Sequence, residues 1–426
     1  MPGMKISASW MNEPAVHTVL KALGASDVDV RFVGGCVRDA ILERPITDID
    51  LATPDLPDAV MAKLEAAGLK AVPTGLSHGT ITAVAEGRGF EVTTLRRDTA
   101  CDGRHAAVEF TTDWREDASR RDFTFNAMSL LPDGQVFDPF GGVADAKAGH
   151  VRFVGEPKDR IQEDYLRILR YFRFLASHGT AAPDPNTLKA CENLRSGLAR
   201  LSAERVAGEF AKLLSTPNPL PSVQAMASTG VLNELFPGAR VAPDFEKLIS
   251  QEGSFVASRQ TDVFWLTRWI ALMSESAAKA AAAMKFSAKQ CRTLEAVTAA
   301  ANAAPGSLNP PDLYRYLYNF VGGANGAEVA LAGIRLASAR VDDKAQEADW
   351  SKFYKVVEDW TPVGFPLTGK DVQNTGVQQG PEIGHLLQAV KATWIDEGFK
   401  TNKTELLRRL KTKLTPPRGG GGASLQ

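Results

Sequence analysis

The sequence predicts an α+β protein, with a mixed β-sheet and helices over the first 150 residues and an all-α remainder. Two patterns support this fold class. Short segments of strand-like character alternate with glycine turns over residues 1–150, whereas helical periodicity begins near Arg152 and continues along the chain. A third observation is length, since 426 residues exceed what one ordinary hydrophobic core serves. We therefore expect several structural units.

Within the first 150 residues, apolar runs bounded by Gly, Pro and Asp predict the individual elements. The expected strands are residues 30–33, 46–53, 81–85, 90–95 and 108–112. Residues 36–43 are expected to start a helix, and residues 57–67 to form another. Pro54 ends the second strand, and a glycine pair forms the turn after the first. Together they predict a sheet domain over residues 1–150.

Beyond this domain, apolar residues at helical spacing predict successive helices. One stripe contains Ile161, Ile168, Leu169, Phe172 and Leu175, and another contains Val206, Phe210, Leu213 and Leu214, with Ser202 as its expected N-cap. Proline-rich joints at 217–221, 309–311 and 362–366 separate the helical parts, and residues 277–283 form an alanine-rich helix. We expect helical units at 151–216, 217–306 and 307–418, followed by a disordered glycine-rich tail at 419–426.

Composition excludes several classes of protein. The charged fraction of 23% and the hydrophobic fraction of 44% are typical of soluble globular proteins. A net charge of −1 provides no general attraction for nucleic acid, so any RNA-binding surface requires local segregation of charge. The four cysteines form no Cys-x-x-Cys pair, which indicates reduced thiols and neither disulfides nor a zinc site. Without a secretory segment or an apolar run of about 18 residues, we expect a cytoplasmic protein with no membrane partner.

The most informative motif joins a glycine turn, Gly34-Gly35 with Arg38, to the pair Asp48 and Asp50. On a strand, residues i and i+2 point to the same face roughly 7 Å apart. Two carboxylates placed in this way suit hard cations that drive phosphoryl transfer, and backbone N–H groups at a glycine turn suit a triphosphate. Either part alone is more often a solvated loop or cap. The combination at this spacing indicates a nucleotide and metal site.

A third carboxylate and a basic segment complete this prediction. Glu91 lies within an apolar strand, where an unpaired carboxylate is costly, although a solvent-facing position is the alternative. The segment at 120–126 offers Arg121, Asp122 and Asn126, which suit phosphate and ribose, although such a segment taken alone is more often a salt-bridged turn.

A second cluster lies at residues 163–173. On a helix Asp164 and Arg167 are neighbours three residues apart, and an acceptor beside a fork of donors can recognise a base edge. Arg170 and Arg173 continue this row toward a triphosphate or a polynucleotide. The alternative is a surface ion pair with solvated arginines. Residues 400–418 form a basic helix with a leucine stripe, which suits phosphate backbone but also a solvated face.

In these motifs the chain resembles the class II tRNA nucleotidyltransferases, which add CCA to tRNA 3′ ends, and the related bacterial poly(A) polymerases. Residues 34–53 resemble the first family motif, 120–128 the second, 138–155 the third, 163–174 the nucleotide-selecting motif and 203–214 the last. Segments 366–372 and 380–384 are similar to the tail. Five motifs in order make this resemblance specific. It implies a palm, neck, body and tail for the units at 1–150, 151–216, 217–306 and 307–418.

The resemblance also implies a role for each residue. Asp48 and Asp50 would bind the two Mg²⁺ ions, with Glu91 as the third carboxylate, while Gly35 and Arg38 would contact the triphosphate. The remaining nucleotide-binding residues would be Arg121, Asp122, Asn126, Asp164, Arg167, Arg170 and Arg173. Asp164 and Arg167 would pair with the incoming C or A, so that the protein acts as the template. The implied partners are tRNA, CTP and ATP, and the implied assembly is a monomer or weak homodimer.

Among family members, residues 74–80 and 102–105 look more like CCA-adding enzymes than poly(A) polymerases. Residues 97–108 resemble the flexible loop that CC-only enzymes lack. With no His-Asp dipeptide, the phosphohydrolase domain of some relatives is not expected. Alternatives are a poly(A) polymerase, a CC-only or A-only enzyme, an inactive tRNA-binding protein, and a small-molecule nucleotidyltransferase. The intact set of carboxylates argues against an inactive tRNA-binding protein, and the Asp164/Arg167 pair argues against a small-molecule nucleotidyltransferase.

Overall fold

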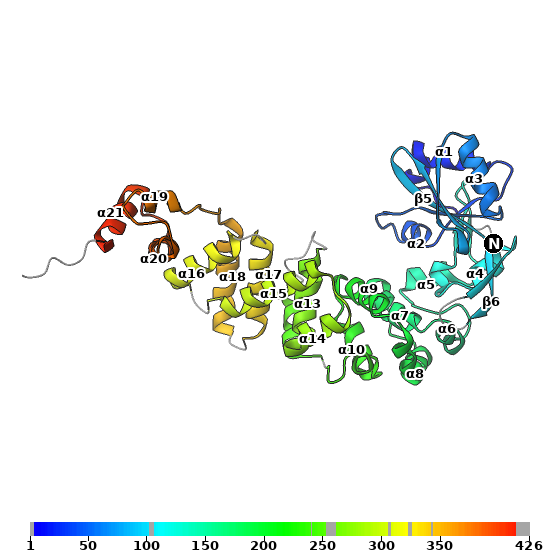
Figure 1. The fold of residues 1–426 in the computed structure, drawn as a ribbon. Coiled ribbons are helices and arrows are strands. Elements are labelled where there is room, and N and C mark those ends of the chain that lie inside the picture. Colours follow the sequence, from blue (N-terminus) through cyan, green and yellow to red (C-terminus); the bar gives the residue numbers. More distant parts are fainter. Residues whose placement is uncertain are drawn as a thin grey trace, which may run out of the picture. The chain divides into compact units, whose positions relative to one another are not determined.

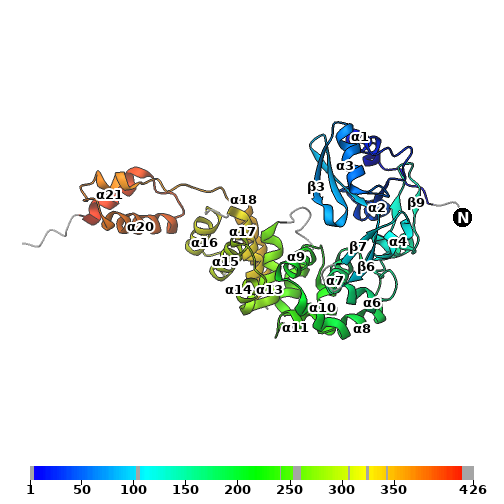
Figure 2. The ribbon, with the colours of Figure 1, turned by 45° about the vertical axis from the view of Figure 1, so that its right-hand side comes forward.

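The computed structural model describes residues 4–101, 106–239, 241–252, 261–305, 308–322, 326–341 and 344–414. The chain forms two compact units, Met1–Val241 and Ala242–Gln426, called here the first and second units (Figures 1 and 2). The first unit contains the β-sheet and the second is helical, so the predicted α+β class is confirmed. Among the described helices, none has the length and apolar character that crossing a bilayer requires.

A seven-stranded mixed sheet organises the first unit, in the order β3-β4-β5-β2-β1-β8-β9 within the described residues. The strands are β1 (Arg31–Val33), β2 (Asp50–Thr53), β3 (Lys70–Gly75), β4 (Thr80–Ala85), β5 (Arg88–Thr94), β8 (Ser129–Leu130) and β9 (Val136–Phe137). β2 and β5 run parallel, while the other neighbouring strands are antiparallel. Helices α1 (Pro14–Ala22) and α3 (Pro57–Ala66) pack on the sheet (Figure 1). Phe32, Leu51 and Phe90 are buried in its core.

The strand predicted at residues 46–53 is shorter than expected, because β2 begins only at Asp50. The preceding segment does not join the sheet. Its Thr47 carbonyl accepts a hydrogen bond from the Arg88 guanidinium at 3.2 Å, so a side chain takes the place of a strand partner. Ile49 is nevertheless buried, while Asp48 and Asp50 are respectively exposed and half-buried. The alternation of exposed and buried side chains therefore continues before the first residue of the strand.

The sequence patterns did not predict β3, β8, β9 or the strand β6 (Arg96–Cys101). β6 pairs with β7 (Ala106–Phe110) in a separate two-stranded sheet. The strand expected at 108–112 thus begins and ends two residues earlier. Residues 102–105, part of the segment that resembles a flexible loop, lie outside the described residues, as does the glycine-rich tail at 419–426.

Helices make up the rest of the first unit. They are α2 (Gly35–Ile41), α4 (Trp114–Ser119), α5 (Gly142–Ala148), α6 (Pro157–Glu163), α7 (Leu166–His178), α8 (Pro185–Leu194), α9 (Ala203–Leu214), α10 (Leu220–Ser228) and α11 (Val231–Leu235), with 3₁₀ turns η1 (Ser9–Asn12), η2 (Leu76–His78), η3 (Thr124–Asn126) and η4 (Arg195–Arg200). α7 and α9 pack together. Ser202 occupies the N-cap position of α9, but its side chain accepts no capping hydrogen bond, so the expected cap is not formed.

One predicted helical stripe is divided between two helices. Ile161 lies on α6, whereas Ile168, Leu169, Phe172 and Leu175 lie on α7. The chain is extended at Asp164, with φ −153° and ψ 109°. The Asp164 side chain accepts a hydrogen bond at 3.1 Å from the backbone N–H of Leu166, at the start of α7. This bond satisfies the N–H of the first residue of α7 at the point where the new helix begins.

The second unit is built from helices that bury large apolar side chains. They are α12 (Pro243–Glu252), α13 (Asp262–Met273), α14 (Ala277–Ala283), α15 (Ala288–Ala303), α16 (Pro310–Tyr316), α17 (Gly326–Ala339), α18 (Lys344–Asp359), α19 (Gly369–Gln373), α20 (Pro381–Asp396) and α21 (Lys403–Leu414), with a 3₁₀ turn η5 (Ser274–Ser276) and a π turn η6 (Leu317–Val321). The alanine-rich helix has the predicted bounds. Trp269, Trp394, Leu406 and Leu410 are buried, and the leucine stripe of the basic segment therefore packs inward.

Candidate active site

The glycine turn has a backbone that an L side chain would strain. Gly34 has φ +73° and ψ −132°, and α2 begins immediately after it. A Cβ atom at Gly34 would lie 3.7 Å from Asp50 Oδ2 and 3.7 Å from Arg121 Nη1. The turn is thus set between a carboxylate from β2 and a guanidinium that follows α4. This arrangement brings the first two predicted motifs together.

The three predicted carboxylates lie close enough to repel one another. Asp50 and Glu91 are direct neighbours across the parallel β2–β5 pair, and Asp48 precedes Asp50 by two residues. Burial, followed by repulsion from Glu91 and Asp48, raises the pKa of Asp50 to about 6, and Arg121 opposes this rise only in part. The sheet therefore holds more negative charge at this point than its own cations neutralise.

This excess of negative charge is what a divalent cation would offset. Carboxylate oxygens are the ligands that hard cations prefer, so the donor set fits such an ion. In the portion of the chain that the structure covers, no three His, Cys, Asp or Glu side chains are already gathered as a metal site. The fit therefore rests on the chemistry of the three carboxylates and on the raised pKa of Asp50.

A cavity of about 550 Å³ lies beside the glycine turn. Its volume is in the range of small-molecule sites. Among the described residues it is lined by Gly34, Gly35, Arg38, Arg96, Arg120, Arg121, Asp122, Asn126, Asp164, Leu166, Arg167, Arg170, Phe174 and Arg205. Seven of these are arginines and two are aspartates, so the cavity favours a polyanion. The lining includes eight predicted site residues, whereas Asp48, Asp50, Glu91 and Arg173 lie outside it.

Buried acids hold the arginines of the second motif in place. Asp117, buried on α4, pairs with Arg120 at 2.9 Å and with Arg121 at 3.0 Å. Burial favours the protonated acid, but Arg121 and Arg120 outweigh it and lower the pKa of Asp117. The sequence analysis missed Asp117. Its spacing of three and four residues before the two arginines was the available signal.

Asp122 and Asn126 are likewise occupied by protein partners. Asn126 Nδ2 donates to Asp122 Oδ1 at 3.0 Å, and Asn126 Oδ1 accepts from Arg38 Nη1 at 2.8 Å. Arg170 Nε donates to Asp122 Oδ2 at 2.6 Å. Although burial opposes it, Arg170 keeps the pKa of Asp122 below its usual range. Asp122 is therefore a buried anion that connects α7 to the glycine turn.

The expected helical pair of Asp164 and Arg167 is not formed, because Asp164 precedes α7. Asp164 Oδ2 instead accepts from Arg205 Nη2 on α9 at 2.7 Å. Arg167 donates to Glu163 and to the backbone carbonyls of Arg160 at 2.9 Å and Arg120 at 3.0 Å. Both side chains still line the same cavity. Arg205 was assigned to the last motif but not to the site, and its partner lies 41 residues away in the chain.

Arg170 and Arg173 share a buried acid on α9 that the site prediction omitted. Glu209 is 5% exposed and accepts from Arg173 Nε at 2.6 Å, with Arg170 Nη1 at 3.9 Å. Phe174 packs against the guanidinium groups of Arg38, Arg170 and Arg173, at 5.4, 5.6 and 3.9 Å from its ring centroid. Arg173 thus acts behind the cavity wall and does not reach the cavity itself.

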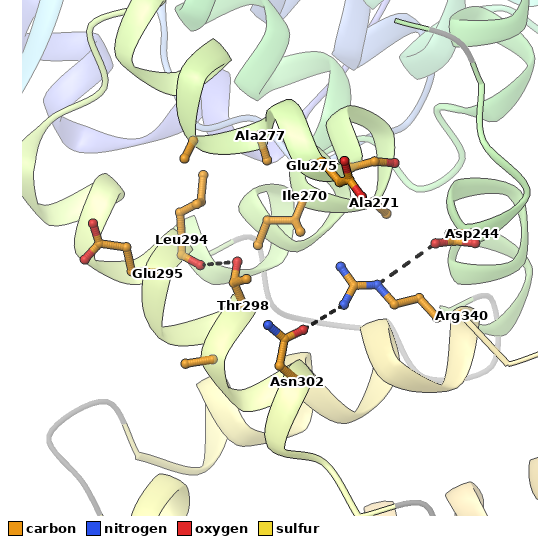
Figure 3. A pocket seen from close by; sticks show the side chains of 13 residues that line it. Asp244, Ile270, Ala271, Glu275, Ala277, Leu294, Glu295, Thr298, Asn302 and Arg340 are labelled. Carbon is orange, nitrogen blue, oxygen red and sulfur yellow. Dashed lines mark hydrogen bonds and ion pairs between the residues drawn. The ribbon is translucent and has the colours of Figure 1, made fainter.

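A second cleft lies within the second unit and has a different character (Figure 3). Its volume is about 740 Å³, and its lining combines Ile270, Leu294 and several alanines with Glu275 and Glu295. Its arginine, Arg340, is held by Asn302 at 3.2 Å and by Asp244 at 4.0 Å (Figure 3). This cleft lacks the clustered cations of the first, so the phosphate-binding candidate is the cavity of the first unit.

Comparison with known proteins gives the family. The model for the Poly A polymerase head domain matches residues 30–152, and that for the probable RNA and SrmB-binding site of polymerase A matches residues 182–242. The chain is 34% identical to the mitochondrial CCA tRNA nucleotidyltransferase 1 of Mus musculus over 387 residues, which cover 90% of this chain and 86% of that protein. It is 32% identical to the CCA-adding enzyme of Levilactobacillus brevis over 382 residues, covering 87% and 90%.

Solved structures agree with these sequence matches. The crystal structure of the Bacillus stearothermophilus CCA-adding enzyme in complex with CTP is similar, with a TM-score of 0.73 and 29% identity, covering 94% of this chain and 99% of that one. The Thermotoga maritima CCA-adding enzyme complexed with tRNA shares the fold, with a TM-score of 0.67 and 20% identity, covering 97% and 100%. The matched lengths, the ordered motifs and the arginine-lined cavity beside the β2 and β5 carboxylates agree: the chain belongs to the CCA tRNA nucleotidyltransferase family.

Proposed function

We propose that this protein adds CCA to the 3′ end of tRNA, using CTP and ATP and releasing pyrophosphate. The observation that carries the proposal is the arginine-lined cavity, which Asp164 lines together with the glycine turn beside Asp50. One nucleotide in this cavity can meet a base-reading acid at one part of the wall and triphosphate-binding cations at another. Family membership supports the same reaction.

The nucleotide is held by groups that the fold has already oriented. Gly35 and Arg38 contact the triphosphate, Arg121 contacts the nucleotide, and Asp122 and Asn126 lie on the ribose side. The bonds of Arg38 to Asp39 and Asn126, at 2.8–2.9 Å, leave guanidinium hydrogens free to meet phosphate oxygens. Such prior orientation reduces the entropy lost when the reactants are aligned.

The tRNA 3′-hydroxyl oxygen attacks the α-phosphorus of CTP or ATP. A new P–O bond forms, the bond between the α-phosphorus and the oxygen that bridges to the β-phosphate breaks, pyrophosphate leaves, and the hydroxyl proton passes to solvent. Asp48 and Asp50, with Glu91 as the third carboxylate, would hold two Mg²⁺ ions, which when bound lower the pKa of the attacking hydroxyl and stabilise the leaving oxygen. Arg38 and Arg121 offset the charge of the departing pyrophosphate.

Nucleotide choice belongs to Asp164 and Arg167 in this proposal, with Arg170 completing the pocket and Arg173 supporting it from behind the cavity wall. In the structure Asp164 is bound to Arg205, and Arg167 is bound to Glu163 and two carbonyls. These protein partners orient Asp164 and Arg167 before a base arrives, and a base that cannot pair with the donors and acceptors that remain is disfavoured.

We assign the remaining parts in the same way. Residues 1–150 are the palm, 151–216 the neck, 217–306 the body and 307–418 a tail that binds tRNA. Within the tail, α21 presents Arg408, Arg409 and Lys411 around its buried leucines, which suits the phosphate backbone. We place the protein in the cytoplasm, and relatives that carry the name mitochondrial make an organelle the alternative.

The test uses purified protein, Mg²⁺, CTP and ATP with three tRNAs that end before CCA, after C and after CC. Products are resolved at single-nucleotide length. Completion of all three to CCA and no further supports the proposal. A stop at CC identifies a CC-adding enzyme, and a long ladder of A identifies a poly(A) polymerase, the activity for which the head-domain model is named. No extension of any acceptor refutes nucleotidyl transfer to tRNA.

A further inference from the structure

Arg38 is held by a neighbouring acid in a two-armed clamp. Its Nε donates to Asp39 Oδ1 at 2.9 Å and its Nη2 donates to Asp39 Oδ2 at 2.8 Å. A bidentate pair of this kind fixes the plane of the guanidinium. Asp39 does not line the cavity, whereas Arg38 does. The direction in which Arg38 meets a nucleotide therefore depends on Asp39.

A histidine at the end of α7 faces the same acid. His178 Nε2 lies 3.6 Å from Asp39 Oδ1, the oxygen that also accepts from Arg38 Nε. The imidazole stacks on Phe125 with ring centroids 5.9 Å apart and packs at 5.5 Å against Phe174. The ring is mostly buried, with 12% of its side chain exposed. Its position is thus set by aromatic packing.

The hydrogen bonds around His178 are compatible with a neutral ring that carries its hydrogen at Nδ1. Ser177 Oγ lies 3.0 Å from the Arg173 carbonyl, to which it can donate its single hydrogen, and 2.7 Å from His178 Nδ1. When the hydroxyl donates to the carbonyl, Nδ1 carries the hydrogen that joins the two side chains. In the neutral ring Nε2 then has only a lone pair, and it is buried without a hydrogen-bond partner. This unpaired nitrogen points toward Asp39.

The charges around the ring oppose each other. Asp39 and Arg38 face it from α2, Arg44 follows that helix, and the neighbours from α7 and η3 are Ser177, Phe174 and Phe125. Burial is the largest influence and, together with Arg38 and Arg44, lowers the pKa of His178 below its usual value against the attraction of Asp39. The ring is accordingly neutral at neutral pH and gains a proton on acidification.

We propose that His178 is a positioning residue that acts on Arg38 through Asp39, so that nucleotide binding depends on the proton at Nε2. While the ring is neutral, both Asp39 oxygens serve Arg38. A proton at Nε2 creates a donor that competes for Asp39 Oδ1, and Arg38 then loses one arm of its clamp. This inference rests on the proposed role of Arg38 in triphosphate binding.

The effect belongs to nucleotide affinity more than to the chemical step, because Asp39 and His178 touch no reacting atom. We expect the wild-type KM for CTP to rise about tenfold as the pH falls from about 8 to about 5, the range in which histidines titrate. Asp50 has a pKa of about 6 and titrates in the same range, but it is present in every variant. The ratio of variant to wild type at each pH therefore reports His178.

The experiment measures KM and kcat for CTP with a tRNA lacking CCA, and in parallel the Kd for CTP by equilibrium dialysis with Mg²⁺. The variants are His178→Phe, which keeps an aromatic ring without a titrating group, and His178→Asn, whose amide nitrogen matches the position of Nδ1 and keeps a neutral donor for Ser177. In both variants, the KM for CTP at acid pH divided by the KM at neutral pH should be smaller than in the wild type and approach the value of a site that does not depend on pH. The exposed His17 on α1 provides the control His17→Phe, which should retain the wild-type profile.

A third variant, Asp39→Asn, tests the route of the effect. In this background His178→Phe should no longer alter the pH profile, because the shared partner has been removed. The inference is wrong if either His178 variant keeps the wild-type acid rise, if both shift KM equally at every pH, or if the wild type shows no acid rise. The two proposals fail separately: a wild type that extends no tRNA refutes the proposed function, while the Kd profile still tests His178.

Discussion

Asp50 on β2 and Glu91 on β5 are direct neighbours in the parallel pair of the sheet. Their repulsion, added to burial and to the charge of Asp48, raises the pKa of Asp50 to about 6. The folded chain is thus less stable with this carboxylate ionised than with it protonated. A site that binds a cation gains affinity from this arrangement, because the cation removes the repulsion.

Replacing Asp50 by Asn should therefore stabilise the metal-free protein at neutral pH. The folded pKa of about 6 lies above the ordinary value of 3.8, so the stability that this group contributes at low pH is lost as the pH rises through about 6. The gain in unfolding free energy should reach at most about 3 kcal/mol at pH 7 and be smaller near pH 4. Urea denaturation with a chelator at the two pH values measures it.

The same substitution should lower kcat by about a thousandfold or more, since it removes a carboxylate from the proposed metal site. Glu65→Gln, at an exposed position on α3, is the matched control and should change neither stability nor turnover. Near-normal turnover of Asp50→Asn would refute the assignment of this carboxylate to the metal site.

Replacing Asp164 by Ala should loosen nucleotide choice more than it slows transfer. Asp164 lines the cavity but does not belong to the carboxylate group around Asp50. A lost base-reading contact should reduce the preference for C and A over U and G by about tenfold or more. Single-turnover incorporation of each nucleotide measures this ratio, with the exposed Asp159→Ala on α6 as control. Strict retention of C-then-A order in the variant would contradict the role.

Replacing Glu209 by Gln should destabilise the first unit by about 3 kcal/mol, because it leaves Arg173 without its buried counter-charge. Arg170 also loses a neighbour, so the KM for CTP should rise. Denaturation and steady-state kinetics measure the two effects. Glu192→Gln removes an exposed ion pair with Lys189 and should have no measurable effect. Equal stability of the two variants would show that the Glu209 pair contributes little.

Gly197 should matter for nucleotide choice although it lies outside the cavity. A Cβ atom there would lie 1.9 Å from the Tyr165 ring, which adjoins Asp164. Gly197→Ala should therefore displace Tyr165, cost about 1–3 kcal/mol of stability and alter discrimination between nucleotides. Among the described residues, a Cβ atom added at Gly208, on α9, would have no neighbouring atom within 4 Å apart from the backbone of its own helix. Gly208→Ala should stabilise the helix by about 0.5–1 kcal/mol, and a similar loss in both variants would exclude the contact with Tyr165 as the cause.

Much of the fold and the residue types of the site followed from the sequence alone. The alanine-rich helix has its predicted bounds, and strands β4 and β5 lie where short apolar runs between turn residues indicated them. Glu91, predicted as a partner of the Asp pair, is the direct neighbour of Asp50. These features depend on local pattern and on turn residues, which act through backbone conformations a few residues long. The two-residue strands β8 and β9 are too short to leave such a pattern.

The partners of the site residues were decided only by tertiary structure. A helix through residues 161–175 satisfied the apolar spacing, yet the chain breaks at Asp164 and turns that side chain to Arg205 on another helix. Arg173 similarly meets Glu209 on α9. Apolar periodicity states which face of a helix is buried but not which charged residue of another helix will lie opposite. That choice arises when helices pack, because a buried charge must find a counter-charge within a few ångströms.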